Sequence, residues 1–132
     1  MARSRSKAVW AGWAISVLGS LLFLFSAALK FMGGPDLDRG MEHLQLGSSM
    51  VLPLAILEIT CIAIYLIPPT AVLGAILMTG YLGGAILTHW RVGDPFVLHI
   101  LLGIALWLGV YLREPRLRAL IPLRTAPAPE EV

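Results

Sequence analysis

The sequence contains a single cysteine, Cys61. One cysteine can form neither an intramolecular disulfide nor a CxxC pair, so a thiol–disulfide relay working within this chain is excluded. Cys61 lies in an apolar run, where a thiol usually packs as a small buried hydrophobic side chain. We therefore expect a packing role for it, with a redox role as the alternative.

Charged residues are also scarce. They make up 14% of the 132 residues, and hydrophobic residues make up 58%, whereas soluble domains carry about 25% charged residues. A soluble fold could not bury so much apolar surface, because a chain of about 150 residues still exposes roughly 30% of its surface. The formal net charge is only +2, which excludes a nucleic-acid binder with a basic face. The expected surroundings are a lipid bilayer.

Four segments approach the length of a membrane-spanning helix, which needs about 20 mostly apolar residues. They cover residues 8–32, 50–67, 70–88 and 96–112. They are apolar on all sides, whereas barrel strands would alternate polar and apolar residues. The sequence therefore predicts an all-α fold: an integral membrane four-helix bundle.

The bundle is predicted to form a single domain over residues 1–124. Residues 125–132 are rich in Pro and Ala and are expected to be a disordered tail. The first apolar stretch, 8–29, exceeds the roughly 7–15 residues of a signal-peptide core, so we expect it to be retained as a helix. Residues 33–47 are predicted to be a polar loop after Gly33, Gly34 and Pro35 end that helix.

The distribution of basic residues predicts the orientation. With four spans, both termini lie on one side, and cytoplasmic segments carry the excess of Lys and Arg. The side of the termini has seven basic residues: Arg3, Arg5, Lys7, Arg113, Arg116, Arg118 and Arg124. The other side has three: Lys30, Arg39 and Arg91. Both termini are therefore predicted to be cytoplasmic.

Small residues mark expected helix contacts, since lipid offers no hydrophobic drive for helix association. Gly12 and Ser16 belong to such a stripe on the first segment, and Gly80 and Gly84 form a GxxxG pair on the third. We predict that these four residues pack helices within one bundle. Contacts in a homo-oligomer are the alternative.

Glu58 is the most informative residue for function. It lies near the middle of the second apolar segment, where an ionised side chain costs roughly 2.5–3.5 kcal/mol on insertion scales. It is expected to face the bundle interior, either as a structural hydrogen-bond partner or as an anchor for a ligand or proton. Lys30 is its natural partner by charge, although Lys30 could instead snorkel to water. Ser26, one turn from Lys30, could bridge the two.

Other chemical signals are weak. His89 and His99 fall near the ends of the last two segments, and His89 is a candidate third member of the polar site with Glu58 and Lys30. No HxxxH or HExxH spacing is present, so no metal site is predicted. The sequence has no phosphate-binding loop, catalytic triad motif or haem-attachment motif. No cofactor is required by these residues, and a self-contained catalytic activity is not expected.

An ordered set of residues resembles the DoxX family, in its DoxX-like branch. The set comprises Lys30, Glu58, the Ile-Pro turn at Ile67 and Pro68, and the GYLGGA…TH run with Gly80, Gly83, Gly84, Thr88 and His89. The resemblance covers roughly residues 26–124. It implies a four-helix protein of the bacterial plasma membrane. It also implies relatives that are linked to quinone-dependent oxidation of sulfur compounds and to membrane complexes that handle thiols and oxidative stress.

Three functions compete at this point. The first is an accessory subunit of a quinone- or thiol-linked membrane redox system, which binds a lipophilic ligand such as a quinone near Glu58 and Lys30 or docks an oxidoreductase partner. The second is a component of a small-solute transporter or channel, with Glu58 in the path. The third is a structural membrane scaffold without catalysis.

Overall fold

The computed structural model describes residues 6–125, and this part of the chain is helical without any strand. In chain order its elements are α1 (Lys7–Met32), α2 (Pro35–His43), the 3-10 turn η1 (Ser48–Met50), α3 (Val51–Leu66), the 3-10 turn η2 (Pro68–Thr70), α4 (Ala71–Arg91), α5 (Val97–Arg113) and α6 (Pro115–Arg118). The predicted all-α class is confirmed.

Three helical stretches are long and apolar enough to cross a membrane: Lys7–Met32, Ser48–Leu66 and Pro68–Arg91. They contain α1, α3 and α4. Helix α5 is also apolar but has only 17 residues, which at 1.5 Å each is about 25 Å, just short of a hydrocarbon core about 30 Å thick. The predicted fourth span therefore depends on α5.

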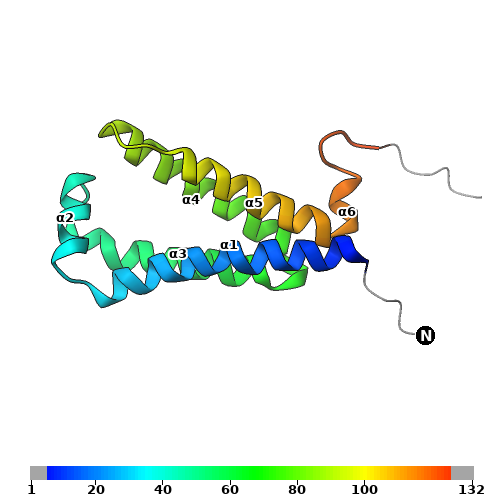
Figure 1. The fold of residues 1–132 in the computed structure, drawn as a ribbon, viewed down its shortest axis with the longest axis horizontal. Helices are drawn as coiled ribbons and strands as arrows, with labels where there is room; N and C mark the ends of the chain where they lie inside the picture. The colour runs from blue at the N-terminus through cyan, green and yellow to red at the C-terminus, as the bar shows by residue number, and fades with distance from the viewer. Residues whose placement is uncertain (1–5, 126–132) are drawn as a thin grey trace, which may run out of the picture.

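The four apolar helices pack side by side in a closed order. Helix α1 contacts α3 and α5, and α4 contacts the same two helices from the other side. Figure 1 shows that α4 and α5 lean away from α1 and α3 toward the end that carries α2, and that the two pairs come together near α6. We call these two ends the α2 end and the α6 end.

The α6 end is held by a buried tyrosine. The Tyr65 side chain is fully buried, and its hydroxyl donates to the Leu106 carbonyl at 2.6 Å and lies 3.0 Å from Ser16 Oγ. Arg113 donates to the Tyr65 carbonyl at 2.7 Å, and its guanidinium stacks 4.4 Å from the Trp13 ring centre. These contacts join α1, α3 and α5.

Glycines allow the backbones to approach closely at this end. A Cβ built on Gly12 would lie 2.7 Å from the Gly109 carbonyl oxygen, and a Cβ on Gly109 would lie 2.5 Å from Ser16 Oγ. A Cβ on Gly74 would collide with the Tyr65 backbone. The predicted packing residues Gly12 and Ser16 thus lie where α1 meets α5, both of them buried.

The predicted polar loop over 33–47 is wrong in part, because it contains helix α2. Gly33 does end α1, with a positive φ of 68°, and Gly34 follows with φ 115°. Pro35 then occupies the first position of α2, with Asp36 and Asp38 in its first turn. Proline is pre-organised for that position, and acidic side chains favour the positive end of the helix dipole.

The other predicted boundaries differ by a few residues. Helix α4 continues to Arg91, three residues beyond the predicted span, and the short α6 follows α5. Apart from Thr125, the predicted tail lies outside the described residues, as do Arg3 and Arg5.

Candidate functional site

Glu58 and Lys30 form an ion pair inside the helix packing. The Lys30 ammonium lies 2.9 Å from Glu58 Oε2, and the two side chains are 14% and 2% exposed. Lys30 also donates to Ser26 Oγ at 2.7 Å, and Ser26 Oγ lies 3.4 Å from Glu58 Oε2. Of the two positions expected for Lys30, the structure has the internal pair.

The two partners come from different heights in neighbouring helices. Lys30 is in the last turn of α1 and Glu58 is in the middle of α3. The flexible four-carbon stem of lysine spans this offset, because it can run along the helix before its ammonium turns inward. An ionised carboxylate at this depth needs a partner, and Lys30 supplies the opposite charge.

The hydrogen-bonding capacity of the pair is not exhausted. Within residues 6–125, the hydrogen bonds of Lys30 account for two of the three protons of its ammonium. In the same range, both hydrogen bonds of Glu58 go to Oε2, so Oε1 can accept from the nearby Tyr81 phenol or from a ligand. One donor and one acceptor are thus available side by side.

The pair lies on the wall of a cavity of ≈ 860 Å³ at the α2 end. The wall is mostly apolar, with contributions from α1 through α5. Its polar lining consists of Ser26, Lys30, Asp36, Glu58, Tyr81, Thr88, His89 and His99. Ligand sites in proteins commonly have this volume and this mixture of an apolar wall with a few polar groups.

Tyr81 was not among the predicted site residues. It lines the cavity from α4, its phenol lies near the Glu58 carboxyl, and its ring packs edge-on against Phe23 with centroids 6.5 Å apart. The sequence signal was a hydroxyl in the middle of an apolar span, at the second position of the GYLGGA run. A tyrosine in such a place usually directs its hydroxyl toward a polar partner.

His89 lies in the same cavity but is not among the hydrogen-bond partners of Glu58. Its Nδ1 lies 2.8 Å from the Ala85 carbonyl, and its ring packs against His99 with centroids 4.4 Å apart. His99 Nδ1 is buried and has no hydrogen-bond partner within residues 6–125. The histidines therefore form a second polar group on the cavity wall. In the same range, no cluster of three His, Cys, Asp or Glu residues could hold a metal ion.

The packing role predicted for Gly80 and Gly84 does not hold within this chain. A Cβ built on either residue would meet no atom of the described residues within 4 Å, and both residues line the cavity. The GxxxG spacing aligns two glycines on one face of α4, but no other helix approaches that face. These glycines provide space, not contact.

Helix α2 covers the open end of the cavity. Its buried Met41 and its Leu37 line the cavity. Polar contacts attach this region to the connection between α4 and α5: His43 Nε2 lies 2.8 Å from Asp94, and Arg91 donates to the Leu44 carbonyl at 2.7 Å. The amphipathic character of α2 thus places apolar side chains toward the cavity and charges at its rim.

The chain was compared with known proteins. No curated protein and no solved structure matches it. The model of the DoxX-like family matches residues 14–113, which is more than half of the chain and includes Lys30, Glu58 and the cavity-lining glycines. The resemblance found in the sequence is thereby confirmed: the chain is a membrane protein and belongs to the DoxX-like family.

Proposed function

We propose that this protein binds a lipophilic molecule with a polar head, of the quinone class, in the cavity at the α2 end, and that it serves as an accessory subunit of a membrane redox system. The observation that carries the proposal is the buried Lys30–Glu58 pair on the wall of a largely apolar cavity of ≈ 860 Å³. A buried ion pair is weak evidence for stability alone. The position of this ion pair on the wall of a cavity favours a role in binding.

The remaining donor and acceptor match the chemistry of such a head. A quinone presents carbonyl oxygens, which accept hydrogen bonds, and the corresponding quinol presents hydroxyls, which donate them. The third proton of Lys30 suits a carbonyl, and Glu58 Oε1 suits a hydroxyl. Tyr81 lines the same wall and can do either. The site can therefore hold both forms.

An accessory role follows from what the chain itself offers. When bound, the quinone would supply the redox chemistry, whereas Lys30, Glu58 and Tyr81 would bind and orient it. The sequence holds one cysteine and no recognisable catalytic motif, so a partner oxidoreductase would exchange the electrons. A homo-oligomer could equally present the site to such a partner.

The proposed setting is the bacterial plasma membrane, crossed four times by α1, α3, α4 and α5, with both termini cytoplasmic. Both the start of α1 and α6 lie at the same end of the molecule (Figure 1), as four crossings require. A cytoplasm-active fluorescent reporter at the C-terminus should be active, and so should a periplasm-active enzyme at Gly40. The reverse pattern would overturn this orientation.

Transport by a single chain is the weaker alternative. The cavity lies at the α2 end, whereas Tyr65, Gly74 and Gly109 pack tightly at the other end. A solute path through one protomer would have to cross this packing. Uptake of solute into protein-containing liposomes would support transport over ligand binding.

The test of the proposed function is stabilisation by decylubiquinone, since a ligand that binds the folded state raises its melting temperature. We expect saturable stabilisation of the purified protein in detergent. Gly84→Leu should fill the cavity and abolish the effect, and Glu58→Gln should weaken it. The matched control is Ala28→Leu, which introduces the same leucine side chain at an exposed position of α1. Absence of saturable stabilisation, or full binding by Gly84→Leu, would refute the proposal.

A further inference from the structure

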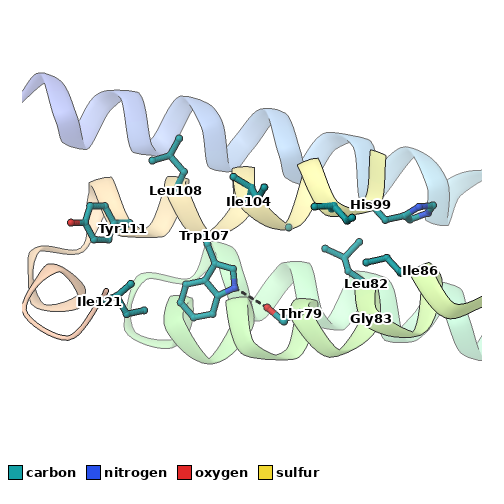
Figure 2. A pocket seen from close by; sticks show the side chains of 12 residues that line it. Thr79, Leu82, Gly83, Ile86, His99, Ile104, Trp107, Leu108, Tyr111 and Ile121 are labelled. Atoms are coloured by element: carbon teal, nitrogen blue, oxygen red, sulfur yellow. Dashed lines mark hydrogen bonds between the residues drawn. The ribbon is translucent and has the colours of Figure 1, made fainter. Parts of the chain in front are cut away.

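A second hollow lies on the outer surface between α4 and α5. It has a volume of ≈ 630 Å³ and is lined mainly by apolar side chains, among them Ile86, Ile100, Ile104 and Leu108 (Figure 2). Ile104 is 59% exposed and Ile100 is 42% exposed, so in a membrane these residues face lipid. We call this hollow the α4–α5 groove.

The groove exists because the helices present glycine at this level. In the part of the chain that the structure describes, a Cβ on Gly83 would meet no atom within 4 Å, and a Cβ on Gly103 would only touch Leu82 Cδ1 at 3.4 Å. Further along, Trp107 reaches from α5 to α4, where its Nε1 donates to Thr79 Oγ1 at 2.8 Å (Figure 2). The groove thus runs from the open space beside Gly83 along Trp107 to Tyr111 and Ile121.

The groove and the cavity are neighbours that share a wall. Leu82 and His99 line both of them. On α4, Gly80 and Gly84 border the cavity and Gly83 borders the groove, so the helix has no side chain at three of five consecutive positions there. Among residues 6–125, only the Leu82 and His99 side chains are common to the two spaces, and rotation of side chains is fast compared with helix movement.

We propose that the α4–α5 groove is the lateral entrance to the cavity from the bilayer and the seat of the apolar chain of the bound molecule. This inference rests on the proposed function, because it concerns the same ligand. The polar head of the bound molecule lies at Lys30 and Glu58. Its apolar chain passes between Leu82 and His99 into the groove. The occupant is therefore a single amphiphile that fills both spaces.

The alternative entrance, beneath α2, suits such a molecule poorly. That rim carries Asp36 and the hydrogen-bonded pair of His43 with Asp94. Moving an apolar chain past charged groups into water is unfavourable, because every methylene that is exposed loses its hydrophobic stabilisation. Through the groove, by contrast, the chain remains in apolar surroundings throughout.

The test separates the chain from the head by using two probes, decylubiquinone and its tail-less dimethoxy-methyl-benzoquinone head. Gly83→Phe should place a ring in the groove without disturbing the fold, since a Cβ at Gly83 meets open space. We expect this variant to lose affinity for decylubiquinone by about tenfold or more and to bind the tail-less head as the wild type does. Leu87→Phe, at a position of α4 that is 63% exposed, is the matched control and should bind both probes normally.

Each result decides the proposal. Normal binding of decylubiquinone by Gly83→Phe, or equal loss of both probes, overturns the entrance and leaves the proposed function standing. If the wild type binds neither probe, the proposed function is refuted together with the entrance. A decyl chain carrying a terminal diazirine should label Ile104 or Trp107, and labelling of α2 instead would show entry beneath that helix.

Discussion

The two ends of the molecule use the same small residues for opposite purposes. At the α6 end, Gly12, Gly74 and Gly109 lie against neighbouring backbone or side-chain atoms, so that no Cβ fits. At the α2 end, Gly80 and Gly84 face a cavity, and no atom of residues 6–125 lies within 4 Å of where their Cβ would be. A glycine therefore marks either a close contact or a space, depending on what lies opposite.

The difference also separates two ways of holding helices together. The α6 end relies on close backbone approach and on the hydrogen bonds of the buried Tyr65. At the α2 end, where α4 and α5 lean away, the Lys30–Glu58 pair joins α1 to α3 beside the cavity. The α6 end is thus held by close packing, whereas the α2 end combines an ion pair with an open cavity.

The largest effect is expected from breaking the buried ion pair. Glu58→Leu leaves the Lys30 ammonium without its counter-charge, and loss of one partner of a buried pair costs about 3–5 kcal/mol. The lower part of that range is expected, since the Lys30 side chain is 14% exposed and can turn toward water. Unfolding by SDS in mixed micelles measures the change.

Removing both charges provides the control for this prediction. The double variant Lys30→Leu with Glu58→Leu should regain most of the lost stability, because no buried charge remains unpaired. If Glu58→Leu is as stable as the wild type, the α2 end does not depend on the pair.

Adding one methyl group is expected to change the free energy of unfolding by a smaller amount, and with opposite sign at the two ends. Gly74→Ala should destabilise the protein by about 1–3 kcal/mol, because its Cβ meets the Tyr65 backbone and overpacking has this cost. Gly84→Ala should instead stabilise by roughly 0.5–1 kcal/mol, since alanine loses less backbone entropy in a helix. Equal effects in SDS unfolding would show that the two ends do not differ in packing.

The smallest effects are expected from removing a hydroxyl. Tyr65→Phe loses the hydrogen bonds to Leu106 and Ser16, and since interhelical hydrogen bonds in membrane proteins contribute about 0.6 kcal/mol each on average, a destabilisation of about 1 kcal/mol is expected. Tyr81→Phe, on the cavity wall, should leave stability unchanged and weaken decylubiquinone binding. A destabilised Tyr81→Phe would place that tyrosine in the structural core rather than at the binding site.

Much of the molecule follows from local sequence. Long apolar runs predicted α1, α3 and α4 to within a few residues, because a bilayer requires that length and that composition. The burial of Glu58 followed from the cost of a charge among lipids. Even α2 was signalled by Pro35 with Asp36 and Asp38 behind it. It was missed because a polar segment between spans was interpreted as a loop.

Other features depend on distances between helices, which the sequence does not contain. Whether Lys30 meets Glu58 or turns to water depends on how far α1 and α3 are offset, and the structure brings the two within 2.9 Å. The cavity exists because α4 and α5 lean away from the other pair of helices (Figure 1). The same tilt makes Tyr81 part of the cavity wall.

The sequence by itself determined that the surroundings are a lipid bilayer, where the long apolar helices lie, and that the Glu58 carboxylate must be buried. Each of these follows from the free energy of transferring side chains between water and lipid. Only the tertiary structure decided what the glycines do. A glycine has no side chain, so its neighbours alone determine whether its position is a contact, as at Gly12, or an open space, as at Gly84.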